Sequence, residues 1–272
     1  MKFNLSNTAI PFMSARIGGF IFSAILIILS FGSFFYSGLN FGIDFKGGTL
    51  IEIETADEVN LADIRSNLNS LSLGDVQVQE FGSTKNILIR VEQQAGGDNV
   101  QQNVVELVKA SLDKNITTSI SYRRTEVVGP KVSGELIQSG IIAIAVAVIA
   151  MLIYIWFRFE WQFSLGAVIA LVHDVILTIG VFCFTQLEFN LPIIAAILTI
   201  VGYSMNDTVV VYDRVRENLR KYRSKPIIEL LDLSINETLS RTVITSVTTL
   251  LALVSLYIFG GSVIKGFTFA MI

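Results

Sequence analysis

The chain has 272 residues, of which 52% are hydrophobic and only 16% are charged, and its mean hydropathy is +0.62. Soluble domains carry about 25% charged residues, so this composition indicates an integral membrane protein. The net charge of −3, with no basic stripe, gives no support for nucleic-acid binding. The single cysteine, Cys183, excludes an intrachain disulfide and a paired-cysteine metal or redox site, and its apolar surroundings predict a buried thiol.

The first apolar stretch, about residues 17–36, has the length of about 20 residues that a bilayer-crossing helix needs. Lys2 and Arg16 precede it, it is longer than a signal-peptide core, and no A-x-A cleavage site follows. We therefore expect residues 1–37 to form the N-terminus and an uncleaved signal anchor, with the N-terminus in the cytoplasm.

Residues 38–135 then have the pattern of a small soluble domain. Alternating apolar residues predict strands, and apolar residues at helical spacing predict helices. We expect strands at 49–54, 76–81, 85–92 and 116–128, and helices around 61–71 and 100–108. The order β-α-β-β-α-β is that of a ferredoxin-like unit. No metal-ligand cluster or nucleophile motif occurs in this segment, so we expect a binding or force-transmitting module rather than an enzyme.

A glycine-rich stretch, FGIDFKGGTL (41–50), opens this domain. Its glycines, Gly42, Gly47 and Gly48, fit neither of the two nucleotide-binding glycine patterns. We interpret the stretch as a turn between the first membrane helix and the first strand. No nucleotide motif occurs elsewhere, so any work must draw on another source, such as a transmembrane potential, which supplies about 2.3 kcal/mol per charge per 100 mV.

Residues 136–272 contain the remaining membrane helices. Four apolar stretches are long enough to span, at about 137–157, 163–185, 191–212 and 242–259. A sixth starts near Val263 and reaches Ile272, and ten residues cannot span a bilayer. We therefore expect six transmembrane helices, with the chain stopping inside the last one.

The basic residues set the expected orientation. Six of them follow the stretch 191–212: Arg214, Arg216, Arg220, Lys221, Arg223 and Lys225. Loops rich in Lys and Arg face the cytoplasm, so the loop at about 213–240 is expected inside, as is the short loop marked by Arg158. The segment 186–190, which has neither residue type, is expected outside. This orientation places residues 38–135 outside.

An acid interrupts one membrane stretch: Asp207, in GYSMNDTVVVYDRVREN (202–218). A charge inside a spanning helix costs about 2.5–3.5 kcal/mol and usually has a function. Either burial keeps the carboxyl neutral, or a cation pairs with it. Arg241, in INETLSRTVITSVTTLL (235–251), is the candidate cation, because it lies near the cytoplasmic end of the next, antiparallel helix. A static pair that pins the helices, or side chains that face the headgroups, are the alternatives.

A second intramembrane acid, Asp174, lies beside the only histidine, His173. Adjacent helical residues point in different directions, so at most one should face a given neighbour. Asp174 is either a second relay acid or a buried hydrogen-bonding group, and His173 is expected to pack rather than titrate. Four further residues are expected to support the relay: Asn206, Thr208, Asp213 and Thr245. For Asp213, a position at the solvated membrane edge is an alternative explanation.

FGIDFKGG, EVVGPKVSGEL (126–136), GYSMNDTVVVYDRVREN and INETLSRTVITSVTTLL resemble the SecF family, the membrane subunits of bacterial SecD–SecF protein-export complexes. The family belongs to the resistance–nodulation–division superfamily of proton-driven transporters. The resemblance extends from the first helix to the start of the sixth. It implies an α-helical inner-membrane bundle of six transmembrane helices, the last one truncated. It also implies that the α+β ferredoxin-like domain between helices 1 and 2 is periplasmic.

The resemblance also implies a function. The chain would use the proton-motive force to promote preprotein translocation and release, with Asp207 as the proton-accepting acid, Arg241 as its charged partner and Asp174 at the acidic position of the third-helix motif. Its partners would be SecD, the SecYEG channel, YajC, the translocating preprotein and the lipid bilayer, and no cofactor is implied.

Three other functions stay open. The chain could be a proton-driven exporter of a small molecule or lipid, although such transporters usually carry both halves in one chain. It could be a purely structural subunit. A protease dyad of Asp174 and Asp207 is the third, but the GxGD pattern of that class is missing. The coupling ion, proton or sodium, is also open.

Overall fold

The computed structural model describes residues 9–81, 83–96 and 98–272, so Lys2 lies outside the described residues. The chain divides into two compact units. The helical unit comprises Met1–Asn40 and Ala143–Ile272, and the sheet unit comprises Phe41–Ile142.

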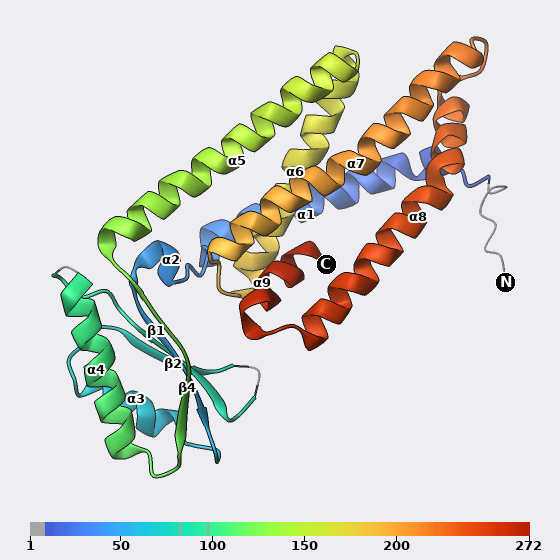
Figure 1. Ribbon diagram of the computed structural model, residues 1–272. Coiled ribbons are helices and arrows are strands. Elements are labelled where there is room, and N and C mark those ends of the chain that lie inside the picture. Colours follow the sequence, from blue (N-terminus) through green and yellow to red (C-terminus); the bar gives the residue numbers. More distant parts are fainter. Residues whose placement is uncertain (1–8, 82, 97) are drawn as a thin grey trace. The chain divides into compact units, whose positions relative to one another are not determined.

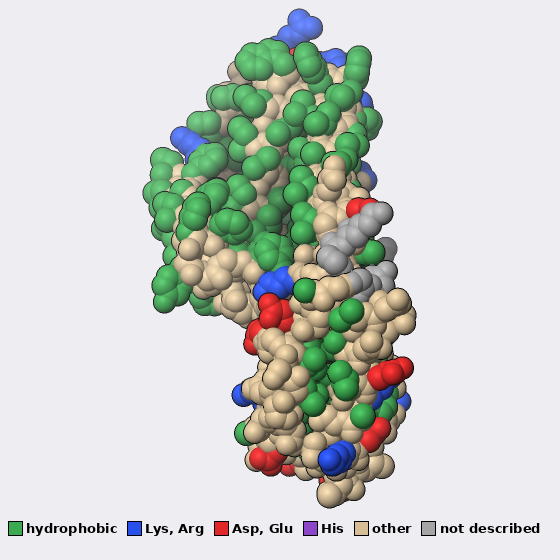
Figure 2. Space-filling view, turned by 90° about the vertical axis from the view of Figure 1, so that its left-hand side faces the viewer, with side chains coloured by type: hydrophobic (Ala, Val, Ile, Leu, Met, Phe, Trp, Pro, Cys, Tyr) green, Lys and Arg blue, Asp and Glu red, His purple; other side chains and the backbone are tan. Residues whose placement is uncertain are grey.

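Five helices in the described part of the chain are long and apolar enough to cross a membrane, as the sequence predicts (Figure 1). They are α1 (Arg16–Ser37), α5 (Pro130–Arg158), α6 (Trp161–Thr185), α7 (Leu191–Lys221) and α8 (Ile227–Phe259). Hydrophobic side chains cover most of the visible surface of the helical unit, whereas on the sheet unit they form only smaller patches among charged side chains and other groups (Figure 2).

The main difference from the sequence prediction lies at about residues 213–240, which are predicted to form a loop. The region is helical except for residues 222–226, because α7 continues to Lys221 and α8 already begins at Ile227. Arg, Glu, Leu and Lys favour helix, and Arg214 pairs with Glu217 one turn on. The buried residues of α8 here recur at helical spacing, at Leu230, Ser234 and Thr238. Because Ser234 and Thr238 are polar, a hydropathy window does not detect this stripe.

Close packing of small residues joins α1 to α6. Gly180 of α6 is buried, and a Cβ built on it would lie 2.8 Å from the Cα of Ser30 in α1. A second contact joins the N-terminal segment to α8. The backbone N–H of Met13, in the short helix η2 (Phe12–Ala15), donates to Asp232 Oδ1 at 2.8 Å. The N–H of Ile10 donates to Asn236 Oδ1 at 3.0 Å.

The last helix, α9 (Ser262–Met271), has 10 residues and is not among the five. Its Phe269 ring lies edge-on to Phe182 of α6, with 5.9 Å between centroids. A Cβ on its Gly266 would lie 3.0 Å from Ile193 of α7. The helix therefore packs against α6 and α7. Cys183 of α6 is fully buried, which confirms the predicted buried thiol.

The sheet unit contains a four-stranded antiparallel sheet with the strand order β2-β3-β1-β4. Its elements follow the order β-α-β-β-α-β after a short helix α2. Their bounds are α2 (Ile43–Lys46), β1 (Gly48–Thr55), α3 (Leu61–Asn69), β2 (Val76–Glu80), β3 (Asn86–Val91), α4 (Asp98–Asn115) and β4 (Ile120–Val128). The last strand begins four residues later than predicted, because α4 extends to Asn115.

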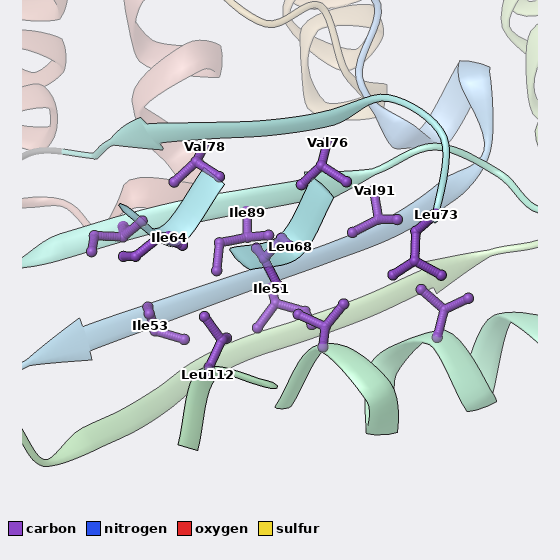
Figure 3. Close-up of a cluster of buried hydrophobic side chains, with 13 residues drawn as sticks. Ile51, Ile53, Ile64, Leu68, Leu73, Val76, Val78, Ile89, Val91 and Leu112 are labelled. Atoms are coloured by element: carbon purple, nitrogen blue, oxygen red, sulfur yellow. The ribbon is translucent and has the colours of Figure 1, made fainter. Parts of the chain in front are cut away.

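One face of this sheet packs on α3 and α4. Alternate residues of β1, such as Ile51 and Ile53, meet Leu68 of α3 and Leu112 of α4 in a single core (Figure 3). All four are at most 2% exposed. At about 25 cal/mol per Å² of apolar surface removed from water, this cluster provides the main stabilisation of the sheet unit.

The glycine-rich stretch is a turn, as predicted. Gly47 ends α2 and has a φ of +72°, and Gly48 starts β1 with a φ of +116°. Both values lie in the region that favours glycine. A Cβ on Gly48 would also collide with the carbonyl oxygen of Val91 in β3. The pair therefore lets the chain turn sharply while β1 pairs with β3.

Candidate functional site

Asp207 lies half-buried on α7, in the helical unit. Its neighbour Asn206 is exposed. The hydroxyl of Thr208 donates to the carbonyl oxygen of Ser204 at 2.9 Å, one turn back along the same helix. The two predicted supporting residues beside Asp207 therefore differ, because Thr208 bonds the helix itself while Asn206 points away from the bundle.

Two hydrogen bonds fix the register of α7 against α8. Tyr203 Oη bonds to Thr249 Oγ1, and Asn218 Nδ2 donates to Ser234 Oγ at 3.0 Å. In two antiparallel helices that rise equally per residue, residues at the same depth have numbers with a constant sum. Both pairs here sum to 452, so Asp207 lies level with Thr245.

By the same register, Arg241 lies level with residue 211, four residues from Asp207. Four residues are about 6 Å along a helix, so Asp207 and Arg241 lie about one turn apart in depth. Within the described residues, no ion pair of 4.0 Å or less joins Asp207 to Arg241. The Arg241 side chain is exposed.

Arg241 instead lines a cavity of about 400 Å³ between the ends of α7 and α8. The other lining residues are Val210, Asp213, Arg214, Glu217, Glu237 and Thr238. Arg214 is already engaged by two of the acids, at 3.0 Å from Glu217 and 3.7 Å from Glu237. Arg241 therefore has acidic neighbours on one side and Asp207 one turn away on the other.

The remaining supporting residues have partners elsewhere. Asp213 pairs with Arg158 at 2.6 Å, and both side chains are about two-fifths exposed, in agreement with a solvated edge. The Thr245 hydroxyl donates to the carbonyl oxygens of Arg241 and Thr242 in its own helix. The hydroxyls of Thr238, Thr242 and Thr248 also bond their own backbone. Two other hydroxyls of α8, those of Thr249 and Ser234, bond side chains of α7.

Asp174 of α6 takes part in a hydrogen-bonded chain across three helices. His173 Nε2 lies 2.5 Å from Ser23 Oγ of α1, and His173 Nδ1 lies 3.0 Å from Asp174 Oδ1. On the other side, Ser204 of α7 donates its hydroxyl to Asp174 Oδ2 at 2.7 Å. An ionised carboxylate only accepts hydrogen bonds, so with Asp174 ionised His173 donates from Nδ1 and accepts from Ser23 at Nε2.

These hydrogen bonds both support and correct the sequence prediction for His173 and Asp174. His173 and Asp174 do face different helices, α1 and α7. They also bond each other, which the simple angular argument does not anticipate, because an imidazole can lie alongside the carboxylate of the next residue. His173 is thus a hydrogen-bonding residue rather than only a packing one.

Ser204 connects this series of hydrogen bonds to the helical turn of α7 that carries Asp207. It lies three residues before Asp207, so the two share a face of α7. The sequence interpretation does not include Ser23 or Ser204. A signal for Ser204 exists, because a hydroxyl one turn from an intramembrane acid can bond where water is scarce. Ser23 has no comparable signal, since its pairing depends on how α1 packs on α6.

Among residues 9–81, 83–96 and 98–272, no three His, Cys, Asp or Glu side chains gather in a way that could hold a metal ion. The arrangement can hold and pass protons between carboxylates, an imidazole and hydroxyls. It also offers an exposed cation, Arg241, about one turn from Asp207 in depth.

Comparisons with known proteins identify the family of the chain. The family described as "Protein export membrane protein SecD/SecF, C-terminal" matches residues 108–272, and the "SecD/SecF GG Motif" matches residues 32–59. A protein translocase subunit SecF from Cereibacter sphaeroides is 47% identical over 277 residues, which cover all of this chain and 85% of the relative. A SecF from Rickettsia felis is 48% identical over 257 residues, 94% of this chain and 83% of the relative.

Solved structures are similar as well. The crystal structure of SecDF, a translocon-associated membrane protein from Thermus thermophilus, matches 98% of this chain with a TM-score of 0.86 and 34% identity. A SecDF structure in a super-membrane-facing form matches 96% with a TM-score of 0.66 and 33% identity. The chain spans 36% and 35% of those longer chains. From these matches, the chain belongs to the SecD/SecF family of protein export membrane proteins.

Proposed function

We propose that the chain is a non-enzymatic subunit of the protein-export machinery of the inner membrane and couples the proton-motive force to preprotein translocation and release. The observation that carries the proposal is the half-buried Asp207 inside a membrane helix, with Arg241 about one turn away and no ion pair between them among the described residues. A carboxyl in this position either holds a proton or attracts the arginine.

In the proposed cycle, Asp207 takes up a proton from the outer side and is neutral. When it releases the proton to the cytoplasm, the carboxylate attracts the Arg241 guanidinium, which moves by about one turn. Arg241 then leaves the acidic cavity at the ends of α7 and α8. The net charge of that cavity therefore becomes more negative. Two arrangements of the same helices, one for each protonation state, would bias the movement of the rest of the complex.

Asp174 has a second role in the proposal. The chain Ser23–His173–Asp174–Ser204 offers a hydrogen-bonded route to the face of α7 that carries Asp207. We assign a supporting role to Thr208, whose hydroxyl donates to the carbonyl oxygen of Ser204. We assign another to Thr245, which lies at the same depth as Asp207. Asn206, which is exposed in the chain by itself, and Asp213, at the solvated edge, remain predictions as supporting residues.

The proposed topology follows the basic residues. The N-terminus and the ends of α7 and α8 face the cytoplasm, and the domain between α1 and α5, predicted at 38–135, faces the periplasm. We assign this domain to the ferredoxin-like class, which its strand order and element order support. We also propose that α9 belongs to a sixth membrane helix, as its packing on α6 and α7 supports.

The proposed partners are SecD, SecYEG, YajC and the translocating preprotein. SecD has the strongest support, because this chain matches about a third of a longer chain described as SecDF. The relatives' name, protein translocase subunit, supports the preprotein as the substrate.

The test is preprotein export in cells that carry Asp207→Asn, with complex assembly measured in parallel. Asn keeps the size and cannot release a proton, so we expect intact assembly and loss of the export that depends on the proton-motive force. Glu229→Gln is the control, since Glu229 lies in the first turn of α8, outside the lining of the acidic cavity, and its side chain is 64% exposed. Normal export by the Asp207→Asn strain would overturn the proposal and leave a purely structural subunit.

A further inference from the structure

A second cavity, of about 540 Å³, lies where α5 ends beside the last three turns of α7. Six charged residues line it: Arg158, Asp213, Arg216, Glu217, Arg220 and Lys221. Four of the six are basic and two are acidic, so the lining has a net charge of +2. None of the four basic residues belongs to the proton relay proposed above, and the following inference does not rest on that function.

Both acids of the lining already have partners. Asp213 pairs with Arg158 at 2.6 Å, and Glu217 pairs with Arg214 at 3.0 Å. In the part of the chain that the structure describes, Arg216, Arg220 and Lys221 have no carboxylate within 4.0 Å. Arg216 donates from Nη1 to the carbonyl oxygen of Arg158 at 3.3 Å. Its Nε is buried and has no hydrogen-bond partner among the described residues. The cavity therefore has donors and positive charge for an anion.

Three large aromatic residues mark the depth of this cavity. Trp156 and Phe157 precede Arg158, and Trp161 begins α6 just after it. They are 66%, 90% and 64% exposed. Exposed tryptophans gather where a membrane meets water, so the basic cavity lies at the level of the lipid headgroups.

We propose that this cavity binds the phosphate group of an anionic phospholipid, whose acyl chains lie against the exposed apolar side chains of α5. Guanidinium groups bind phosphate oxygens through pairs of parallel hydrogen bonds, and basic pockets between membrane helices bind anionic headgroups. Free phosphate has the same anionic oxygens. The aromatic residues favour the lipid, because only a lipid also contacts an apolar surface.

The two tryptophans of the chain, Trp156 and Trp161, flank Arg158 of the cavity lining in the sequence, so we use their fluorescence to report on lipid bound there. The full chain is reconstituted into phosphatidylcholine vesicles that contain a minor share of brominated phosphatidylglycerol. A parallel sample carries the same share of brominated phosphatidylcholine. Bromine quenches tryptophan on contact, and the ratio of the two quenching curves gives the relative association constant. We expect stronger quenching by the anionic lipid.

The cavity variant is Arg220→Gln with Lys221→Gln. Each cation near a membrane surface changes the affinity for an anionic lipid by about fivefold, so the variant should lower the relative association constant by about 25-fold. Arg220→Lys with Lys221→Arg keeps both charges and should restore most of the preference. The matched control is Arg223→Gln with Lys225→Gln, which removes the same charge nearby but outside the cavity lining, and it should retain the preference.

Four outcomes would overturn the proposal. Equal quenching by both lipids would show that the cavity does not select anionic lipid. An equal loss in the control variant would reduce the preference to general surface charge. Displacement of the brominated lipid by millimolar inorganic phosphate would make free phosphate the ligand. Unchanged quenching in the cavity variant, with loss of a co-purifying partner, would assign the cavity to an acidic protein surface and contradict the proposal equally.

Discussion

In the sheet unit, the apolar side chains of β1, α3 and α4 lie inside a single core, whereas in the helical unit many of the largest apolar side chains lie on the surface. The most apolar windows of α1 and α8 contain no buried residue at all. The sheet unit thus carries its stabilising contacts within itself. The helical unit relies on lipid or on partner subunits to cover its apolar surface, so the same substitution should have different consequences in the two units.

Leu68→Ala should give the largest effect and tests this difference directly. Leu68 is fully buried in the core of the sheet unit, and such a truncation costs about 2–5 kcal/mol. Ile244→Ala on α8 is the control, because Ile244 is 58% exposed and its truncation leaves no cavity. Denaturant unfolding of the purified chain measures both. Comparable losses would contradict the contrast between the two units.

Gly180→Ala should destabilise the helical unit by about 1–3 kcal/mol, the usual cost of overpacking. The new methyl group would meet the backbone of Ser30 at 2.8 Å, so α1 must move away from α6. Gly202→Ala on α7 is the matched control, since nothing lies within 4 Å of a Cβ there. Thermal unfolding in detergent compares the two. Equal destabilisation by the control would mean that the contact with α1 is not the cause.

Tyr122→Phe should destabilise the sheet unit by about 1 kcal/mol at neutral pH. Tyr122 Oη donates to Asp113 Oδ1 at 2.8 Å. Burial and then this neighbouring carboxylate raise the pKa of Tyr122 far above its usual value of about 10. A raised pKa means that the folded chain keeps the proton longer than the unfolded chain. The stabilisation is complete below about pH 10 and is lost as the pH rises further toward the folded-state pKa.

The measurement for Tyr122 is unfolding of the wild type and the Tyr122→Phe variant at neutral pH and above pH 10. The difference in unfolding free energy between them should shrink at high pH. A difference that stays constant across this range would contradict the linkage.

Ser204→Ala should have the smallest effect on stability. It removes one hydrogen bond to Asp174, and such bonds between membrane helices are worth about 0.6 kcal/mol on average. If the chain through His173 serves as a proton route, export should fall more than this small loss of stability explains. Thr199→Ala is the control, since its hydroxyl bonds only its own helix. Unchanged export in the Ser204→Ala strain would separate Asp174 from the relay.

The sequence predicts the elements of both units better than it predicts their contacts. Alternation and helical spacing locate the four strands, and apolar length locates the five long helices, because these signals are local. The extension of α7 and α8 past the apolar stretch is missed, since two of the three buried residues in the first turns of α8, Ser234 and Thr238, are themselves polar and give no hydropathy signal.

The candidate site divides in the same way. Asp207, Asp174 and Arg241 stand out because charged residues are costly within membrane helices. Their partners depend on packing between helices. The one-turn offset of Arg241 follows from the register set by Tyr203 and Thr249, and the bond between Ser23 and His173 follows from the close approach of α1 to α6. Neither can be deduced from the spacing of residues along a single helix.

The hydrogen bonds from the N-terminal segment to α8 have a consequence for biosynthesis. Ile10 and Met13 are made before their partners, Asn236 and Asp232, which follow 226 and 219 positions later. At about 5–20 residues per second, the ribosome needs roughly 10–45 seconds to supply them. During that interval the backbone N–H groups of Ile10 and Met13 lack these two partners, so the contact between the N-terminal segment and α8 forms only after α8 is made.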